Sequence, residues 1–438
     1  MKNPRLTLTQ TLDIEITLEK IVPWIQHFNP AVILNSNSGE QLQNDKYHSF
    51  DFLLALGEVS HFSEEKYLFD NLKNFHSKLN DWLIGYLSYD VKNQIENLHS
   101  TNYDGISAPE NFFFCPRYVI VFNGKTLNVH YLPEFDSEKD IFSLIDSLKN
   151  QASDKKQLGN EINTASRVSK EEYIKNINAI KKHIRRGDIY EMNYCIEFYS
   201  ENALIDPPSV YGRLNTLSPM PFSTYLRINN HFLMCASPER FLAKRKNKII
   251  SQPIKGTAKR GENEKEDKQI IDILKSDPKE HAENVMIVDL VRNDLSHTAA
   301  RGSVIVEELF GIKTFHQLHQ MQSTVTSELK NDIPFTDAIK NSFPMGSMTG
   351  APKIRAMELI EKYESTKRGI YSGTVGYITP DGDFDFNVII RSILYNSENR
   401  YLSFMAGSAI TDGSDGEKEY EECMLKVAAM KKVFQKGS

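Results

Sequence analysis

One lysine, Lys255, stands in a short segment that proline and glycine frame, PIKGT (253–257). The strand-like run KNKIISQPI leads into it, so we expect a turn with the lysine amine at its tip. A lysine attacks carbon electrophiles when burial or a neighbouring cation lowers its pKa. Most lysines in turns are solvated, so the pentapeptide alone favours a solvated side chain over a nucleophile.

Carboxylates recur on two segments with helical periodicity. In HAENVMIVDLVRNDL (281–295), Glu283 and Asp294 fall on one face with apolar residues, where an acid needs a basic partner or a metal. In EKEYEECMLKVAAM (417–430), Glu419, Glu422 and Lys426 share a face. Two carboxylates one turn apart suit Mg²⁺, which prefers oxygen ligands. A solvated face, or an acid favoured near a helix start, is the alternative for each segment.

Two glycine-rich pieces, FPMGSMTGAPK (343–353) and AGSA (406–409), offer backbone amides to an anion. The amides of Thr349 and Gly350 belong to the first piece and are candidates for binding a substrate. The phosphate-loop pattern GxxxxGK[ST] is absent, as is GxGxxG after a strand. Nucleotide binding is therefore not expected, and a carboxylate is the alternative anion.

Composition narrows the class of protein that carries these groups. The 438 residues include 58 acidic and 52 basic side chains, a net charge of −6, with no long basic stripe. We expect no nucleic-acid partner. The sequence shows no apolar leader and no run of about 18 apolar residues, so we expect a cytoplasmic protein without membrane binding. Its four cysteines form no CxxC pair, which predicts reduced structural thiols.

The elements that must position these side chains divide the chain in three. Residues 1–147 contain several strand-like runs and an Asn-Gly pair at 123–124 that favours a hairpin. Residues 148–168 are polar and read as a linker or loop. Residues 169–438 begin with a helix capped by Ser169 and ended near Gly187, then interleave strands and helices. The fold class we expect is α+β.

Taken together and in order, eight segments resemble the chorismate-utilising enzymes, which include anthranilate synthase large subunits, aminodeoxychorismate synthase component I, and isochorismate and salicylate synthases. The resemblance spans about residues 169–432. The segments are SPERF (237–241), PIKGT (253–257), AENVMIVDLVRNDL (282–295), FPMGSMTGAPK (343–353), YSGTVGY (371–377), NVIIRS (387–392), AGSAI (406–410) and EYEECMLK (419–426).

The resemblance implies a single large αββα sandwich, the anthranilate synthase component I-like fold, with the active site between the sheets and residues 1–147 packed on the same body. It implies that Glu283 and Glu422 hold Mg²⁺, with Glu419 acting through water. The metal would grip the ring carboxylate of chorismate, and Lys426 would meet the same carboxylate.

Further roles follow from the same resemblance. Tyr371 and Arg391 are similar to the pair that holds the enolpyruvyl carboxylate, helped by amides around Gly407 and Ser408. A guanidinium suits that role because it binds a carboxylate at two points. Glu239 of SPERF is similar to the general acid that protonates the departing C4 hydroxyl, a role that requires a raised carboxyl pKa.

Lys255 selects a branch within the family, because PIKGT is typical of aminodeoxychorismate synthase component I, whereas anthranilate and isochorismate synthases read PIAGT. The implied reaction makes 4-amino-4-deoxychorismate through a covalent intermediate on Lys255, in the p-aminobenzoate and folate pathway. Ammonia would come from a glutamine amidotransferase subunit, and a separate pyridoxal-phosphate lyase would complete p-aminobenzoate. An anthranilate or isochorismate synthase and a non-catalytic chorismate-binding subunit are the alternatives.

Two positions depart from the family pattern. Glu191 stands where aminating relatives usually have Gln and isochorismate-type enzymes have a lysine that activates water. Gln320 stands where the family commonly has His, with His319 one residue earlier. In the anthranilate branch that histidine is tied to the later steps, so its absence at position 320 disfavours pyruvate elimination. In some relatives a pocket in the N-terminal region binds tryptophan, and the segment VILNSNS (32–38) is weakly suggestive of such a site.

Overall fold

The computed structural model describes residues 4–13, 16–37, 45–152 and 161–435 of the chain. Within these ranges the strands form one connected antiparallel arrangement with two halves that share β5 (Asn111–Asn123). Along one edge β5 pairs with β3 (Phe52–Phe62) of the first half. Along the other edge it pairs with β4 (Leu83–Leu87) of the second half and with β6 (Thr126–Tyr131). This long strand therefore ties the two halves together.

The first half runs through strands far apart in sequence, each paired with the next. In order they are β3 (Phe52–Phe62), β2 (Ala31–Asn35), β9 (Phe222–Ile228), β10 (His231–Ser237), β19 (Ser392–Asn396), β20 (Tyr401–Ile410) and β8 (Glu191–Ser200), with β7 (Ala165–Ser166) and β16 (Gly350–Ala351) on the edge of β8.

The second half starts from the other side of β5. Its strands are β4 (Leu83–Leu87), β17 (Thr374–Ile378), β18 (Phe384–Val388), β11 (Arg240–Arg245), β12 (Lys248–Gln252) and β15 (Leu318–Glu328), with β13 (Ile254–Lys259) and β14 (Ile305–Thr314) also paired to β15. A short ribbon of β1 (Leu6–Thr11) and β6 (Thr126–Tyr131) extends from β5.

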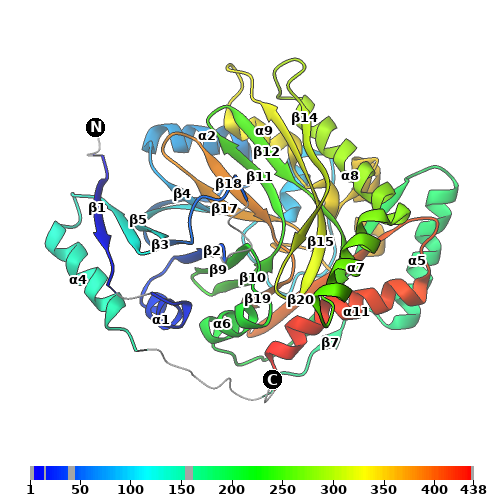
Figure 1. The fold of residues 1–438 in the computed structure, drawn as a ribbon, viewed down its shortest axis with the longest axis horizontal. Helices are drawn as coiled ribbons and strands as arrows, with labels where there is room; N and C mark the ends of the chain where they lie inside the picture. The colour runs from blue at the N-terminus through cyan, green and yellow to red at the C-terminus, as the bar shows by residue number, and fades with distance from the viewer. Residues whose placement is uncertain (1–3, 14–15, 38–44, 153–160, 436–438) are drawn as a thin grey trace.

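Alternation of side chains along β2 shows how the first half is buried on both faces. Ala31 and Ile33 belong to one apolar cluster, whereas Val32 and Leu34 belong to another. Helices cover the first cluster, and Figure 1 shows α1 and α6 below the strands. These helices are α1 (Leu18–Trp24), α4 (Glu138–Lys149), α5 (Lys170–Arg185), α6 (Pro207–Leu217), α10 (Lys353–Tyr363) and α11 (Gly416–Val433).

The second cluster fills the space between the two halves and continues under helices of the opposite side, α2 (Leu68–Leu79), α8 (Pro278–Ser296) and α9 (Phe335–Ser342). Figure 1 shows α2 and α9 in the upper part of the molecule, on the side away from α1 and α6. Two further helices, α3 (Lys92–Ile95) and α7 (Glu264–Ser276), complete the body. The order of layers is therefore helix, sheet, sheet, helix, as expected from the sequence.

Local signals in the sequence form the elements that they predicted. The Ser169 hydroxyl accepts a hydrogen bond from the Glu172 amide at 3.2 Å and begins α5. Tyr173, Ile177 and Ile180 then face the core, and each stabilises the fold by roughly 1.5–3 kcal/mol. The hairpin between β5 and β6 turns at Gly124, whose φ of 58° lies in the left-handed region.

The three predicted parts are interwoven in the sheets, because β2 pairs with β9 and β4 pairs with β17. The segment 148–168 begins inside α4 and ends after β7, and residues 153–160 lie outside the described ranges. All four cysteines are buried and free. Among the described helices, none combines the length and the apolar composition that crossing a membrane would require.

Candidate active site

Lys255 lies in strand β13 rather than at the tip of a turn. The pairing of β13 with β15 shifts between Ile254 and Thr257, so a bulge in the strand takes the place of the expected turn. Gly256 has a φ of 85°, and a Cβ there would come within 2.9 Å of Glu280 Oε2. The Pro and Gly of PIKGT therefore shape a bulge that turns the lysine inward, and its side chain is only 12% exposed.

Two carboxylates hold the Lys255 amine. Its Nζ donates to Glu191 Oε1 at 2.9 Å and lies 3.7 Å from Glu283 Oε2. Burial lowers the pKa of Lys255, but the charges of Glu191 and Glu283 outweigh it and the pKa is raised. This differs from the lowered pKa that the sequence led us to consider. Without substrate, the lysine is a protonated member of a buried ion-pair cluster.

Glu191 belongs to a strand whose two faces differ in polarity. On β8, Met192, Tyr194 and neighbouring alternate residues enter the first apolar cluster, while Glu191, Cys195 and Glu197 point to the other side. Glu191 is 2% exposed, and its Oε2 has no hydrogen-bond partner among the described residues. Because this position departs from the family pattern, a carboxylate contacts the amine of the candidate nucleophile, Lys255.

Glu239 lies between β10 and β11 and is 4% exposed. The Ser347 hydroxyl donates to its Oε1 at 2.7 Å. Burial raises the pKa of the Glu239 carboxyl to about 7, although the Ser347 hydrogen bond and the Lys255 charge oppose this rise. A carboxyl with such a pKa carries a proton for a substantial part of the time near neutral pH, which suits a proton donor.

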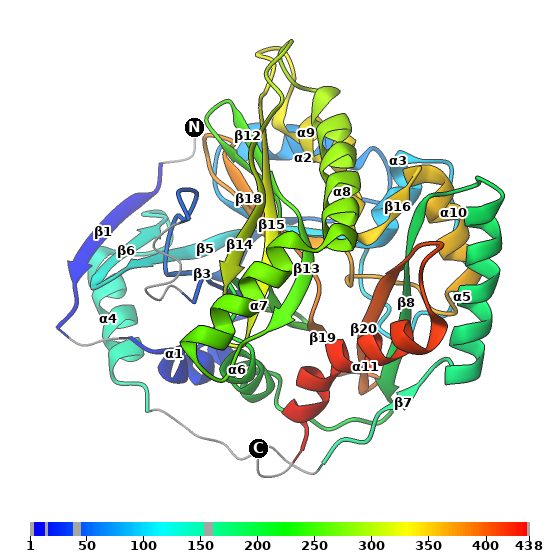
Figure 2. The same ribbon diagram turned by 45° about the vertical axis from the view of Figure 1, so that its right-hand side comes forward.

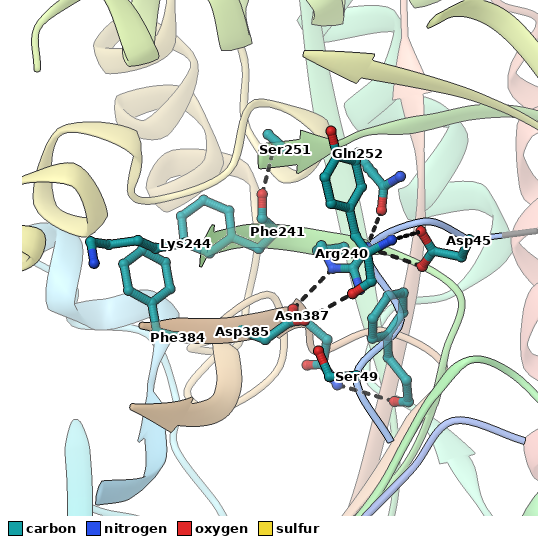
Figure 3. A network of polar contacts seen from close by, with 12 residues as sticks. Asp45, Ser49, Arg240, Phe241, Lys244, Ser251, Gln252, Phe384, Asp385 and Asn387 are labelled. Carbon is teal, nitrogen blue, oxygen red and sulfur yellow. Dashed lines mark hydrogen bonds and ion pairs between the residues drawn. The ribbon is translucent and has the colours of Figure 1, made fainter. Parts of the chain in front are cut away.

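The neighbouring residue, Arg240, fixes the backbone at Glu239. Its guanidinium is 3% exposed and forms ion pairs with Asp385 at 3.0 Å and Asp45 at 3.2 Å. Figure 3 shows this network, which also includes Gln252. Arg240 is the first residue of β11, so the network holds the backbone that directly follows Glu239.

The acids expected to hold Mg²⁺ come from two helices. Glu283 of α8 lies 3.7 Å from both Lys255 and Lys279, whereas Glu422 of α11 pairs with Lys426 at 2.7 Å. Burial raises the pKa of Glu283, and the charge of Glu422 contributes in the same direction. The two carboxylates therefore interact, and Glu419 is buried one turn before Glu422.

These acids suit a hard divalent cation because all of them are oxygen donors. Their negative charges repel one another, and a bound cation would relieve that repulsion. Among the described ranges, no group of three or more His, Cys, Asp or Glu side chains is already close enough to hold a metal ion. Glu422 is 47% exposed on its side chain, so it has room to move. The oxygen donors therefore fit Mg²⁺ in their chemistry, and their binding of the metal stays a prediction.

Two of the residues predicted to hold the substrate, Tyr371 and Gly407, lie against Cys195 of strand β8. Tyr371 is 4% exposed, and its Oη lies 3.8 Å from Cys195 Sγ; burial raises the pKa of this phenol, so it stays a neutral donor. Gly407 of β20 pairs with Cys195, and a Cβ there would come within 2.2 Å of Tyr194 O. The Gly407 carbonyl accepts from Lys426 Nζ at 3.0 Å.

Arg391 is half-buried with a φ of 51°, and within the described structure no carboxylate forms an ion pair with it. Its NH1 approaches Met220 Sδ at 3.8 Å. Burial lowers the pKa of this guanidinium to about 10, so a neighbouring anion would be strongly favoured. An arginine without an acidic partner is what a site for a substrate carboxylate needs.

The remaining predicted residues mainly shape the backbone. Gly350 of β16 pairs with Met192 of β8, and a Cβ there would come within 2.2 Å of Glu191 O. The Thr349 carbonyl accepts from the Asn193 amide at 2.8 Å. The Ser408 hydroxyl meets Tyr173 Oη at 3.2 Å. These residues hold β8 in place. Their direct contact with substrate stays a prediction.

The structure also shows contacts near the site that the sequence did not indicate. Ser347 lies in a motif that was noted for its glycines, and nothing in the sequence indicates that its hydroxyl reaches Glu239. Cys195 was read as a structural thiol. Gln320 pairs with Thr257, two residues after Lys255, and its Nε2 donates to Thr257 Oγ1 at 3.4 Å. His319 is buried against Asp267 at 2.8 Å.

A separate observation concerns the N-terminal segment 32–38. Leu34, Asn35 and Ser36 line a cavity of 530 Å³ together with Arg240 and residues of β17 and β18, while residue 38 lies outside the described ranges. Binding of an effector such as tryptophan in this cavity stays a prediction.

Comparison with known proteins identifies similar chains. The family model for chorismate binding enzymes matches residues 15–432. A probable chloroplastic aminodeoxychorismate synthase of Oryza sativa subsp. japonica is 35% identical over 392 residues, which are 81% of this chain and 43% of that protein. Anthranilate synthase component 1 of Acetivibrio thermocellus is 32% identical over 390 residues, covering 84% of this chain and 77% of the relative.

Among solved structures, anthranilate synthase component I of Streptococcus pneumoniae superposes with a TM-score of 0.78 at 25% identity, over 86% of this chain and 91% of that chain. This likeness confirms the predicted fold class. The chain spans less than half the length of the rice relative but most of the anthranilate synthase chains. Relatives with two different reactions are thus about equally similar.

Proposed function

Because the chain belongs to the family of chorismate-binding enzymes, we propose that it aminates chorismate at C4 to give 4-amino-4-deoxychorismate, through a covalent intermediate on Lys255. The observation that carries this proposal is the buried Lys255 amine, in the segment PIKGT that resembles the aminodeoxychorismate branch of the family. A buried lysine beside a proton donor such as Glu239 supports nucleophilic catalysis.

In the first step the Lys255 amine adds at ring C2, both ring double bonds shift, from C1=C2 to C1=C6 and from C5=C6 to C4=C5, and the bond from C4 to its hydroxyl breaks. Glu239 gives its proton to the departing oxygen, which leaves as water. The amine attacks only in its neutral form, and the Glu191 carboxylate at 2.9 Å is positioned to accept its proton. Dividing the substitution into two steps is the benefit of a covalent intermediate.

In the second step ammonia attacks C4, both ring double bonds shift back to C5=C6 and C1=C2, and the bond from C2 to the protonated Lys255 nitrogen breaks to release the neutral amine. The enolpyruvyl group stays attached. The ammonia would come from a glutamine amidotransferase subunit, and a separate lyase would convert the product to p-aminobenzoate for folate synthesis. Both partners belong to the proposal.

Substrate binding in this scheme uses carboxylate contacts at two ends. Arg391 and Tyr371 would hold the enolpyruvyl carboxylate, and Lys426 would meet the ring carboxylate. Glu283 and Glu422 would hold Mg²⁺, with Glu419 acting through water. When bound, Mg²⁺ would supply positive charge for the ring carboxylate and screen the acids around Lys255.

The products formed from chorismate test the proposal. We expect the purified chain with chorismate, Mg²⁺ and ammonium to yield p-aminobenzoate only after an aminodeoxychorismate lyase is added. Anthranilate would instead indicate the reaction of the anthranilate synthase relatives, and isochorismate would indicate addition of water. Unchanged chorismate that remains bound would indicate a non-catalytic binding subunit.

The Glu239 pKa of about 7 leads to a prediction on pH. Because the donor must carry its proton, kcat/KM for chorismate should be high below pH 7 and fall as the pH rises through that value. The Ser347 hydrogen bond lowers this pKa, so Ser347→Ala should raise it and move the alkaline limb upward by about half to one pH unit. The measurement is a pH profile of kcat/KM.

Ser342→Ala is the matched control, since this buried serine lines the same cavity of 320 Å³ as Glu239 and Ser347. Its profile should match that of the unaltered protein. An alkaline limb that stays in place in Ser347→Ala would assign the proton donor to another group.

A further inference from the structure

A third cavity, of 610 Å³, lies where segments 88–90, 104–110 and 366–370 meet strands β8, β19 and β20. Figure 2 shows α3 and α10, which flank two of these segments, next to each other, and Lys92 of α3 pairs with Glu361 of α10 at 2.7 Å. We call it the acidic cavity, after the four carboxylates in its lining, Asp90, Asp104, Glu110 and Glu197.

Two of the charged residues in the lining are already neutralised. Glu197 pairs with Arg167 at 3.1 Å and also accepts from the hydroxyls of Tyr401 and Ser403. Arg368 pairs with Glu364 at 2.6 Å. These groups are satisfied within the fold, so they neither attract nor repel a ligand strongly.

The other charges leave an excess of negative charge. Asp90, Asp104 and Glu110 face the cavity with one cation of the lining, Lys367. Buried Lys92, outside the lining, lies 3.6 Å from Asp90 but is shared with Glu361 at 2.7 Å, so the negative charge stays in excess. Burial raises the pKa of Asp90 although the Lys92 charge opposes this rise, and burial together with the Asp90 charge raises the pKa of Glu110. Two carboxylates that repel each other across a cavity are stabilised by a positive charge placed between them.

The hydrogen-bonding groups indicate the kind of cation. The Ser88 hydroxyl lines the cavity, Ser88 is 2% exposed, and its Oγ has no hydrogen-bond partner within the described residues. A buried hydroxyl normally has a partner. Carboxylates and a hydroxyl together offer acceptors to a ligand with several N–H groups. The ligand they fit is a small ammonium-type cation.

The cavity lies behind the candidate active site. Ile370 lines it, and the next residue, Tyr371, reaches the active-site pocket, where its Oη lies 3.8 Å from Cys195 Sγ. Cys195 and Glu197 share the polar face of β8 with Glu191, which holds Lys255. One strand face thus runs from the acidic cavity to the nucleophile, over a length of about 20 Å.

We infer that the acidic cavity binds the ammonium ion that supplies the nitrogen of the reaction, an inference that rests on the proposed function. An ammonium ion becomes a nucleophile when one of its protons moves to a carboxylate of the cavity, which then returns that proton to solvent. The neutral ammonia formed in this way keeps its electron pair for attack at C4.

The experiment compares the response to ammonium chloride with the response to chorismate. Asp104→Asn with Glu110→Gln removes two charges and keeps the acceptor oxygens for Ser107 and Gln94. We expect KM for ammonium to rise about tenfold, while KM for chorismate and the amount of Lys255 adduct formed without ammonium stay unchanged. Ala108→Lys, which adds a cation to the lining, should raise KM for ammonium further.

Glu138→Gln is the matched control, because Glu138 begins α4, on the opposite side of the molecule from α3 in Figure 2. An unchanged KM for ammonium in both cavity variants would overturn the inference, as would a rise equal to that of the control. Loss of adduct formation would also overturn it, since that step needs no ammonium. If the unaltered chain forms no aminated product at all, the proposed function itself fails.

Discussion

Lys255→Ala is expected to abolish the covalent adduct and to lower the turnover of chorismate to the aminated product by at least about 10³-fold. Its amine is the candidate nucleophile, and alanine at this position cannot form a bond to C2. Intact-mass analysis after incubation with chorismate and Mg²⁺, in the absence of ammonium, should show an added mass on the unaltered chain and none on the variant.

Lys279→Ala is the matched control for this prediction. Lys279 also lies 3.7 Å from Glu283, but its side chain is 61% exposed, so it is less enclosed than Lys255. The adduct should form normally in this variant. An adduct that survives Lys255→Ala would assign the nucleophile to another side chain and remove the feature that distinguishes the aminating reaction.

The second large effect is expected from Glu283→Gln. This change removes a charged oxygen ligand from the predicted Mg²⁺ site while keeping the shape of the side chain. Substitutions in the outer shell of metal sites already weaken binding by about 10–100-fold, so loss of a direct ligand should raise the Mg²⁺ concentration for half-maximal activity by at least about 100-fold. A titration of activity with Mg²⁺ measures this shift.

Glu280→Gln separates the metal role from a general loss of negative charge. Glu280 lies one turn earlier on α8, and its charge also acts on Lys255. We expect its Mg²⁺ requirement to stay within about threefold of the unaltered value. Equal shifts in the two variants would mean that Glu283 contributes charge to the pocket without binding the metal.

The fold was predictable where signals are local. The cap at Ser169 and the turn at Gly124 depend on neighbours within a few residues, and both formed as expected. The pairing of β2 with β9 and of β4 with β17 joins segments more than 180 residues apart in sequence. Hydrophobic alternation predicts that such strands are buried, but it contains no information about which strands pair.

The candidate site was predictable in its residue types but not in its connections. Pro and Gly favour turns, so the sequence predicts a turn at Lys255. In the structure the strand continues through this position with a bulge. On α8 the apolar face is centred on Ile287 and Val291, so Glu283 lies at its edge and is half-buried. One helical position of error in phase is enough to change which acid points inward.

The electrostatic state of Lys255 could not be predicted from the sequence at all. A raised rather than lowered pKa depends on Glu191, which is 64 residues away in sequence and reaches the lysine only because β8 and β13 converge. The bond from Ser347 to Glu239 spans 108 residues. Contacts of this kind follow from tertiary packing, for which a single sequence carries no direct signal.

Identifying the position of nitrogen in the product is the most direct test of the central claim. The purified chain would be supplied with chorismate, Mg²⁺ and ¹⁵N-ammonium, and the isolated product analysed by mass spectrometry and NMR. We predict one ¹⁵N atom bonded to C4, with the enolpyruvyl group retained. Nitrogen on an aromatic ring that has lost pyruvate, or a hydroxylated product without ¹⁵N, would contradict the account.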